Sequence, residues 1–365
     1  MITKIPVSEP TISEQDIKTV KKCMESGWIS SAGPAIYRFG RKFAKFIGTK
    51  YALPVSTGTA ALHLALLAIG VKPSDEVIMP ALTFVSPASM TTALGARAIF
   101  VDVVKNTFLI DPAKIEAKIT SKTKAIIAVH LYGYPADLDP ILRIANKYRL
   151  KIIEDCAEAL GATYHGKKVG SFGNVTCFSF YGNKFITTGE GGILSTNCAR
   201  IYKKAQLYCD HGMRKEKRYY HQVVGYNYRL TAIQASLGIS QLKRIKTFLR
   251  LRKKINDNYK KELKGLRKIQ WAQKTADSEP VCWLTTILLP NKKTRDRLWQ
   301  FLKEKGVETR KVFYPLPNMP PYPAKESFPY AQEISQRGLS LPTFTHIKAA
   351  QIKFVSKAIK EFLEN

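Results

Sequence analysis

The chain has 365 residues, of which 45% are hydrophobic, and this length allows one large folded domain and a smaller one. Its formal net charge is +30, and the segment from Lys243 to Lys268 holds twelve basic residues against two acidic ones. Because no zinc-finger, RNP or GXXG motif accompanies this charge, we expect a solvated basic surface rather than nucleic-acid binding as the main function.

The apolar segments are too short to cross a membrane, and the stretch from Ala60 to Val71 is interrupted by His63. The N-terminal residues contain no apolar core of a signal peptide. The six cysteines form no CxxC pair and show no metal-ligand spacing with histidine. We therefore expect free thiols, no metal site and a reducing, cytoplasmic location.

From about residue 50, short apolar strands alternate with helices. The expected strands are 51–55, 76–80, 98–102, 124–130 and 151–155, and the expected helices begin at 57 or cover 87–94, 112–119 and 139–149. Continuous β-branched runs separated by helices are typical of an α/β fold with a mainly parallel sheet covered on both faces. Ligands of such sheets bind beyond the carboxyl ends of the strands, where Gly58, Phe84 and Asp155 would lie.

After about residue 240 the pattern changes. A basic helix over 242–266, a strand over 281–289 and helices over 294–305 and 349–363 predict a smaller α/β domain. We therefore divide the chain into a large domain, 1–240, and a small C-terminal domain, 241–365. The proline-rich loop 313–323 contains a PxxP string, as SH3 ligands do, but we expect it to form a rigid wall of a site through Tyr314 and Tyr322.

The segment 177–192 contains Lys184 among apolar and small residues. A lysine that loses water has a lowered pKa, and its neutral amine can form a Schiff base. The strand 151–155 ends in Asp155, whose carboxylate suits a pyridinium nitrogen. A lysine and an acid with these roles predict a site for pyridoxal phosphate (PLP), whereas the lysine segment taken alone would also be compatible with a surface loop.

Three further positions are candidates for contacts with such a cofactor. Gly58 and Thr59 follow a strand and open a helix, where free N–H groups bind anions, although Thr57 or Thr59 could simply cap the helix. Ser179 could add a hydroxyl to the same phosphate, or be a buried strand residue. Phe84 could stack on an aromatic ring, or pack in the core. The segment 161–168 lacks the last residue of a P-loop and reads as a hairpin turn.

Several ordered blocks of the chain resemble the DegT/DnrJ/EryC1/StrS family of PLP-dependent sugar aminotransferases. The resemblance runs from Gly27 to the C-terminal helix, and its blocks are 27–34, 56–65, 129–133, 154–159, 178–192 and 224–229. It implies the type I aminotransferase fold, with a seven-stranded sheet in the large domain, and a homodimer with shared active sites. Lys184, rather than the histidine of some relatives, argues against a 3-dehydratase.

The resemblance also implies roles for individual residues. Lys184 would form the Schiff base, Asp155 would hold the pyridinium nitrogen, and Glu158 would lie near the phenolic oxygen, where many relatives carry Gln or His. The phosphate would be held by Gly58, Thr59, Ser179 and, from the partner subunit, Asn227. Phe84 would cover the ring. Arg214 and Arg218, with Tyr314, are candidates for binding the nucleotide sugar.

The implied reaction transfers an amino group from glutamate to the 4-keto group of a nucleotide-linked 4-keto-6-deoxy sugar. Blocks 154–159, 182–192 and 210–213 are most similar to enzymes that use GDP-4-keto-6-deoxymannose. A UDP- or dTDP-linked sugar, or amination at C3, is the first alternative. The second is a non-catalytic regulatory or nucleic-acid-binding protein of this fold, which the retention of Lys184, Asp155 and Asn227 disfavours.

Overall fold

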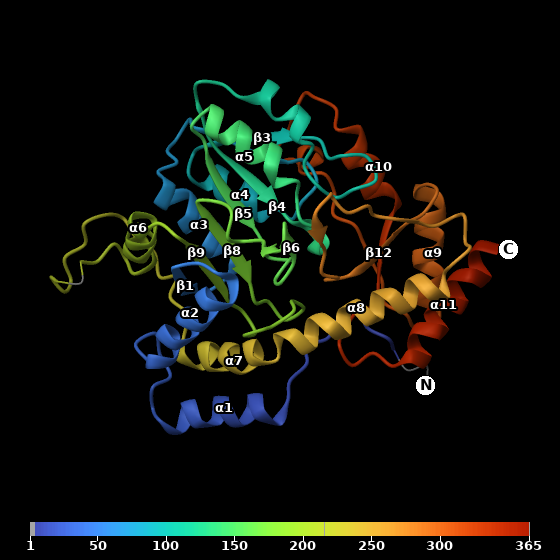
Figure 1. Ribbon diagram of the computed structural model, residues 1–365, viewed down its shortest axis with the longest axis horizontal. Coiled ribbons are helices and arrows are strands. Elements are labelled where there is room, and N and C mark those ends of the chain that lie inside the picture. Colours follow the sequence, from blue (N-terminus) through green and yellow to red (C-terminus); the bar gives the residue numbers. More distant parts are fainter. Residues whose placement is uncertain (1–3, 215, 365) are drawn as a thin grey trace.

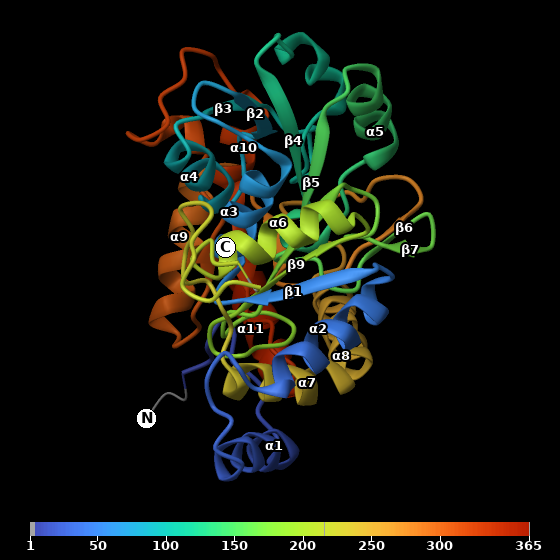
Figure 2. The same ribbon diagram turned by 90° about the vertical axis from the view of Figure 1, so that its left-hand side faces the viewer.

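The computed structural model describes residues 4–214 and 216–364, and a seven-stranded sheet forms its centre (Figures 1 and 2). Its strands, in the order of the sheet, are β1 (Tyr51–Val55), β9 (Gly192–Thr196), β8 (Val175–Ser179), β5 (Lys151–Asp155), β4 (Thr123–Val129), β2 (Glu76–Pro80) and β3 (Arg97–Val101). β9 alone runs opposite to the other six strands: it pairs antiparallel with β1 and β8, and all other pairs in the sheet are parallel. The expected α/β fold with a mainly parallel sheet is therefore confirmed.

Helices cover both faces of this sheet because its strands are apolar along their whole length; all five residues of β2 are buried. The helices of this part are α1 (Glu14–Glu25), α2 (Pro34–Ile47), α3 (Gly58–Ile69), α4 (Ser86–Ala93), α5 (Leu138–Lys147), α6 (Ala199–Cys209) and α7 (Ala232–Lys243). In Figure 2, α6 and α2 lie on opposite sides of β1. Helix α3 packs on β8 and β9, which brings its N-terminus to the carboxyl end of β8.

A second, four-stranded sheet lies beyond the long helix α8 (Ile245–Glu262). Its order is β10 (Gln270–Trp271), β12 (Thr285–Leu288), β14 (Gly338–Leu341) and β13 (Arg310–Lys311), and the helices α9 (Lys292–Glu304), α10 (Pro329–Arg337) and α11 (Ala349–Glu364) belong to the same part of the chain. Helix α8 contributes Phe248 to the core of the large sheet and Ile255 and Tyr259 to a second core. The division at residue 240 stays a prediction.

Three small elements complete the fold. The strands β6 (Thr163–Tyr164) and β7 (Lys167–Lys168) form a hairpin whose turn residues, His165 and Gly166, both have positive φ, as the expected hairpin turn requires. The strand β11 (Ser278–Glu279) pairs with β6, so the C-terminal part of the chain adds a strand to a sheet of the large part.

Two of the expected helices differ from the structure. The segment 112–119 forms two 3-10 turns, Pro112–Lys114 and Glu116–Lys118, and the backbone becomes extended at Ile119. The helix expected over 242–266 is divided at Arg244, whose backbone leaves the helical region.

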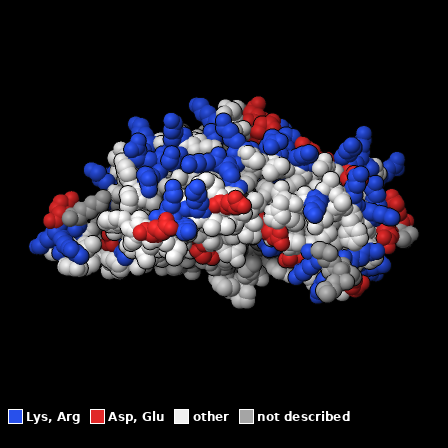
Figure 3. Space-filling view, turned by 90° about the horizontal axis from the view of Figure 1, so that it is seen from below, with Lys and Arg blue, Asp and Glu red and all other residues white. Residues whose placement is uncertain are grey.

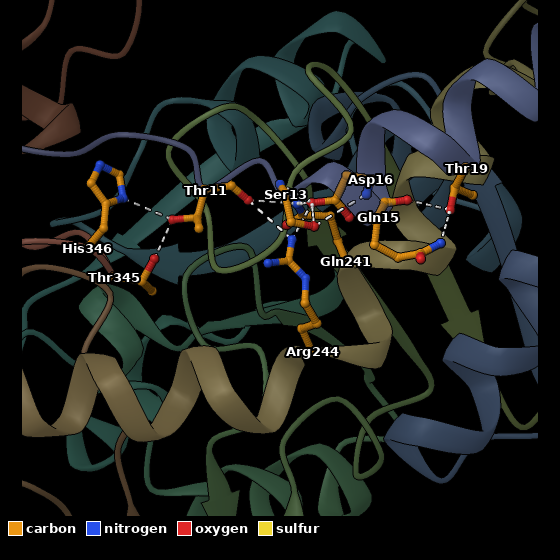
Figure 4. Close-up of polar contacts among 9 residues, drawn as sticks. All are labelled: Thr11, Ser13, Gln15, Asp16, Thr19, Gln241, Arg244, Thr345 and His346. Carbon is orange, nitrogen blue, oxygen red and sulfur yellow. Dashed lines mark hydrogen bonds and ion pairs between the residues drawn. The ribbon is translucent and has the colours of Figure 1, made fainter.

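The break at Arg244 lies where the N-terminal helix α1 is anchored (Figure 4). Asp16 is fully buried, and its Oδ2 accepts hydrogen bonds from Ser13 N (2.9 Å), from Gln241 Nε2 (2.9 Å) and from the Arg244 guanidinium. Ser13 and Asp16 also form a capping box at the start of α1. One buried carboxylate therefore caps α1 and joins it to the α7–α8 junction.

Lysine and arginine side chains are spread over the face seen from below in Figure 1, with fewer acids among them (Figure 3). Helix α8 contributes the exposed side chains of Lys246, Arg250, Lys253 and Lys254 to the surface. Among the helices of the described residues, none combines the length and the apolar character needed to cross a membrane.

Candidate active site

A cavity of about 440 Å³ opens at the carboxyl ends of β4, β5 and β8, beside the N-terminus of α3. It lies where a parallel sheet is expected to bind ligands. Seven of the residues predicted from the sequence line it together: Gly58, Thr59, Phe84, Asp155, Glu158, Ser179 and Lys184.

Lys184 lies in a loop between β8 and β9 that closes on itself. Phe180 N donates to Gly191 O (2.9 Å), and Thr188 N donates to Phe180 O (3.0 Å). A Cβ at Gly191 would lie 2.1 Å from the Thr188 hydroxyl, so only glycine fits there without rearrangement. These contacts hold the loop at the carboxyl end of β8, where Lys184 lines the cavity.

The Lys184 amine is largely removed from water. Its Nζ lies 3.5 Å from Glu158 Oε1 and 4.0 Å from the centre of the Trp283 ring. Burial lowers the pKa of Lys184, while the negative charges of Glu158 and Asp155 oppose this effect. The net lowering favours the neutral amine that nucleophilic and base chemistry require.

The two buried acids that line the cavity, Asp155 and Glu158, are held by backbone donors. Asp155 Oδ1 accepts from Ala157 N (3.0 Å), and Glu158 Oε2 accepts from Tyr132 N (2.9 Å). Burial raises the pKa of both carboxyls, and the nearby charge of Lys184 opposes it. A cationic ring nitrogen placed beside Asp155 would therefore stabilise the ionised carboxylate.

Behind Asp155, His130 and Glu154 form a buried pair. Ala136 N donates to His130 Nδ1 (3.0 Å), so His130 Nε2 carries the proton and donates to Glu154 Oε2 (3.2 Å). Glu154 also accepts from the N–H groups of the loop 170–173. Cys156 lies close enough to complete a metal-ligand trio, but the histidine and carboxylate atoms are already engaged in hydrogen bonds. This cluster secures the end of β5.

The start of α3 has the features of a phosphate cradle. Thr57 is the N-cap, since its Oγ1 accepts from Ala60 N (2.9 Å), and this leaves Thr59 to contact Ser86 Oγ (2.8 Å). A Cβ on Gly58 would lie 2.8 Å from Ser179 Cβ. The N–H groups of Gly58 and Thr59 find no acceptor among residues 4–214 and 216–364, and they are free to bind an anion.

Aromatic side chains, among them Phe84, Trp283 and Phe313, line the same cavity as the start of α3. Tyr132 is buried with φ of 54° and is stacked between Trp283 and Phe313, at 5.8 and 5.6 Å between ring centres. Phe84 is 50% exposed, and its ring lies 5.7 Å from that of Phe313. Phe84 is therefore available to a planar ligand.

The other predicted residues lie outside the cavity of this chain. Tyr314 is exposed, as are Arg214, Arg218 and Asn227 in the segment between α6 and α7. This segment projects from the body of the molecule in Figure 1. Asn227 pairs with Asp210 at its base, and Arg214 Nε donates to Gln222 (3.0 Å).

Among the cavity residues that were not predicted, three come from the C-terminal part of the chain: Trp283, Arg310 and Phe313. They come from the second sheet and the loop beside it, more than a hundred residues after Asp155 in the chain. Trp283 Nε1 donates to Asn183 O (3.0 Å) and so ties the second sheet to the Lys184 loop. Trp283 lies in an apolar run and Arg310 belongs to no recognisable motif, so the local sequence does not mark either as a site residue.

The fold and the cavity together define an α/β aminotransferase with a largely buried lysine in a closed loop. The chain belongs to the DegT/DnrJ/EryC1/StrS aminotransferase family, which matches residues 10–360, and it is a PLP-dependent sugar aminotransferase. GDP-perosamine synthase of Escherichia coli O157:H7 is 42% identical over 359 residues, which cover 98% of each chain. GDP-perosamine synthase of Caulobacter vibrioides is 41% identical over 99% of each chain.

Solved structures agree with this assignment. The crystal structure of S. venezuelae DesV in complex with a ketimine intermediate matches with a TM-score of 0.91 at 31% identity, over 96% of this chain and 95% of DesV. The expected type I aminotransferase fold is therefore confirmed.

The residues present in the cavity fit PLP. The cofactor needs a lysine amine, an anion opposite its ring nitrogen and donors for its phosphate. Lys184, Asp155 and the N-terminus of α3 with Ser179 offer these groups around one cavity.

Proposed function

We propose that this enzyme transfers the amino group of glutamate to the 4-keto group of GDP-4-keto-6-deoxymannose and so forms GDP-perosamine. The position of Lys184, between Glu158 and Trp283 in the cavity, carries the aminotransferase part of the proposal. The sugar is supported by the identity of about 40% to two GDP-perosamine synthases over nearly the whole chain.

In this proposal each cavity residue has one role. Bound PLP supplies the electron sink that stabilises negative charge at the substrate carbon. Asp155 keeps the ring nitrogen protonated, while the N–H groups of Gly58 and Thr59, with the Ser179 hydroxyl, hold the phosphate. Phe84 covers the ring.

Lys184 is the proton carrier. Burial lowers the pKa of its amine, which favours the neutral form that can act as a base. With PLP held in the cavity, the free Lys184 amine would take the proton from the α-carbon of the amino donor and return it later in the reaction. Glu158, 3.5 Å away, holds the amine in place and stabilises the positive charge that the amine carries while it holds the proton.

We further propose a homodimer with shared sites. The projecting segment between α6 and α7 would place Asn227 at the phosphate of the partner subunit, with Arg214 and Arg218 at the diphosphate of the sugar nucleotide. Tyr314, exposed beside the cavity, would contact the sugar nucleotide as well. The cysteines of the chain are free thiols, which accords with a cytoplasmic enzyme.

The test is a direct assay with purified protein, PLP and L-glutamate. We expect GDP-4-keto-6-deoxymannose to be converted to GDP-perosamine with a kcat/KM at least tenfold above those of UDP- and dTDP-linked 4-keto-6-deoxy sugars, a difference of about 1.4 kcal/mol. Lys184→Ala is the control and should abolish turnover. Preference for a UDP- or dTDP-linked sugar, or an amine at C3, would replace the proposed substrate but leave the class of reaction intact.

A further inference from the structure

The basic run from Lys243 to Lys268 is not used by the proposed reaction. Most of it forms α8, and the exposed cations of this helix are Lys246, Arg250, Lys253, Lys254, Lys260 and Lys261. Because successive residues of a helix are about 100° apart, these positions fall within about a third of its circumference and extend over about 22 Å. We call these cations, together with Lys264 and Arg267 in the turn that follows, the α8 face.

The charges of the α8 face are hardly neutralised by the protein itself. Within residues 4–214 and 216–364, only Lys253 among them forms an ion pair, with Asp257 at 3.0 Å. Lys246, Arg250 and Lys254 are spaced four residues apart, and like charges at this spacing repel one another across one turn of the helix. An anionic partner would remove this repulsion, so the α8 face is suited to bind one.

Apolar side chains are exposed beside these cations. Beyond the end of α8, Leu266 and Trp271 line an open depression of about 500 Å³ together with Lys260, Lys264 and Arg267. Leu266 and Trp271 are both partly exposed, and Lys260 Nζ lies 5.7 Å from the centre of the Trp271 ring. An indole next to cations is typical of surfaces that lie at the boundary between lipid headgroups and water.

We propose that the α8 face binds to the surface of an anionic lipid bilayer. Charge complementarity supports this partner, because anionic headgroups diffuse in the plane of the membrane and can gather under cations of any spacing. Figure 3 shows lysine and arginine side chains spread over the underside of the molecule, with few acids among them. None of the described residues of the α8 face lines the cavity, so the enzyme could work while it is bound to lipid.

A nucleic acid is the alternative partner for a basic surface. Lysine predominates over arginine on the α8 face, and lysine is a point charge without the forked geometry that recognises bases. Bases of a single strand stack on aromatic rings, and α8 exposes none over its described residues, Ile245–Glu262. These observations favour the lipid surface, and the test below includes the nucleic acid as a competing outcome.

The experiment measures the cosedimentation of the full-length, PLP-loaded protein with vesicles at physiological ionic strength. The vesicles consist of phosphatidylcholine alone, or of an equimolar mixture of phosphatidylcholine and phosphatidylglycerol. The test variant removes exposed charges along the α8 face and combines Lys246→Gln, Arg250→Gln, Lys254→Gln and Lys261→Gln.

A matched control variant removes the same number of charges from another part of the surface. Its exposed positions lie in the loops before β2, after β3, before β4 and after α5, and it combines Lys72→Gln, Lys105→Gln, Lys122→Gln and Arg149→Gln. In Figure 1, β3 and α5 lie at the top, away from α8. Because the two variants have the same net charge, a difference between them reflects the position of the charges.

We expect the unaltered protein to bind the anionic vesicles, to leave the phosphatidylcholine vesicles unbound, and to be released as salt is added. The α8-face variant should lose at least about a hundredfold in affinity for the anionic vesicles, since each cation near the surface contributes about fivefold. The control variant should lose only a few-fold. The thermal unfolding and the visible absorption of bound PLP should be unchanged in both variants.

Three results would overturn the inference. One is the failure of the unaltered protein to bind anionic vesicles at physiological ionic strength. Another is an equal loss of binding in the two variants, which would mean that net charge alone attracts the protein. The last comes from titration with an RNA or DNA oligonucleotide: tighter binding than to the vesicles, lost in the α8-face variant, would assign this face to a nucleic acid.

Discussion

Glu154 and Asp155 are neighbours at the end of β5, yet their surroundings affect them in opposite ways. Burial raises the pKa of Asp155, and the backbone N–H of Ala157 and the charge of Lys184 compensate only in part. Burial also acts to raise the pKa of Glu154, but the hydrogen bond from His130, with those from the N–H groups of Gly173 and Gly170, holds it below its ordinary value. Ionised Asp155 would therefore be stabilised by a cationic group of the ligand, whereas ionised Glu154 is already stabilised by hydrogen bonds from the protein.

The depressed pKa of Glu154 gives a prediction for stability and pH. A carboxyl whose pKa is lower in the folded than in the unfolded chain stabilises the fold at pH values above its ordinary pKa of 4.5. This stabilisation is lost as the pH falls through the lower pKa that the carboxyl has in the folded chain. Glu154→Gln should cost about 1–3 kcal/mol at pH 7 and flatten the loss of stability in acid. Urea unfolding between neutral and acid pH measures both, with the exposed Glu25→Gln as control.

Gly58 gives a second prediction at this scale. A methyl group there would lie 2.8 Å from Ser179 Cβ and would separate the start of α3 from β8. Gly58→Ala should therefore raise the dissociation constant of PLP by about tenfold, at a cost of about 1–3 kcal/mol for overpacking. Titration of apo protein with PLP tests this, and Gly182→Ala, whose Cβ would meet nothing within 4 Å, is the control. Equal affinity in the two variants would remove the proposed cradle.

At the scale of elements, helix α1 is attached to the rest of the protein mainly through the hydrogen bonds of Asp16. The helix presents few apolar residues to the rest of the protein, and Cys23 and Asp16 are its buried side chains. Asp16 receives hydrogen bonds from Ser13, Gln241 and the Arg244 guanidinium (Figure 4). The buried carboxylate of Asp16 thus anchors α1 to the protein, whereas α2 is anchored by its buried apolar side chains.

We expect Asp16→Ala to destabilise the protein by about 1–3 kcal/mol, because it leaves the partly buried Arg244 without its ion pair. Ser13→Ala should cost about 1 kcal/mol through loss of the cap. Urea unfolding gives both values, with the exposed Gln15→Ala as control. If Asp16→Ala were as mild as Gln15→Ala, packing and not the carboxylate would hold α1.

At the scale of the whole molecule, the candidate cofactor-binding residues Lys184 and Asp155 line the cavity. Asn227, a third candidate, lies outside the cavity in the projecting segment between α6 and α7. If two subunits share sites, a mixture of Lys184→Ala with Asn227→Ala should regain activity after the subunits exchange. Each mixed dimer then carries one site with neither substitution. Activity assays before and after mixing test this, and light scattering gives the number of subunits. No recovery despite proven exchange would mean that each subunit works alone.

The amino-acid sequence by itself determined the class of fold, the cofactor and the residues that lie in continuous motifs. Lys184, Asp155, Glu158 and the turn at Gly58 are recognisable because each sits in a short segment whose conformation depends on its immediate neighbours, such as the strand β5 or the glycines after Lys184. Short apolar runs likewise predicted five of the seven strands of the large sheet, β1 to β5, since burial on both faces leaves a pattern in the chain.

Only the tertiary structure decided which distant residues complete the cavity. Trp283, Arg310 and Phe313 reach it because the second sheet packs against the Lys184 loop through the Trp283–Asn183 hydrogen bond. The break of the basic helix at Arg244 and the burial of Asp16 also depend on a contact across more than two hundred residues. Such pairs leave no local periodicity, because their energy comes from neighbours that the chain brings together only when it folds.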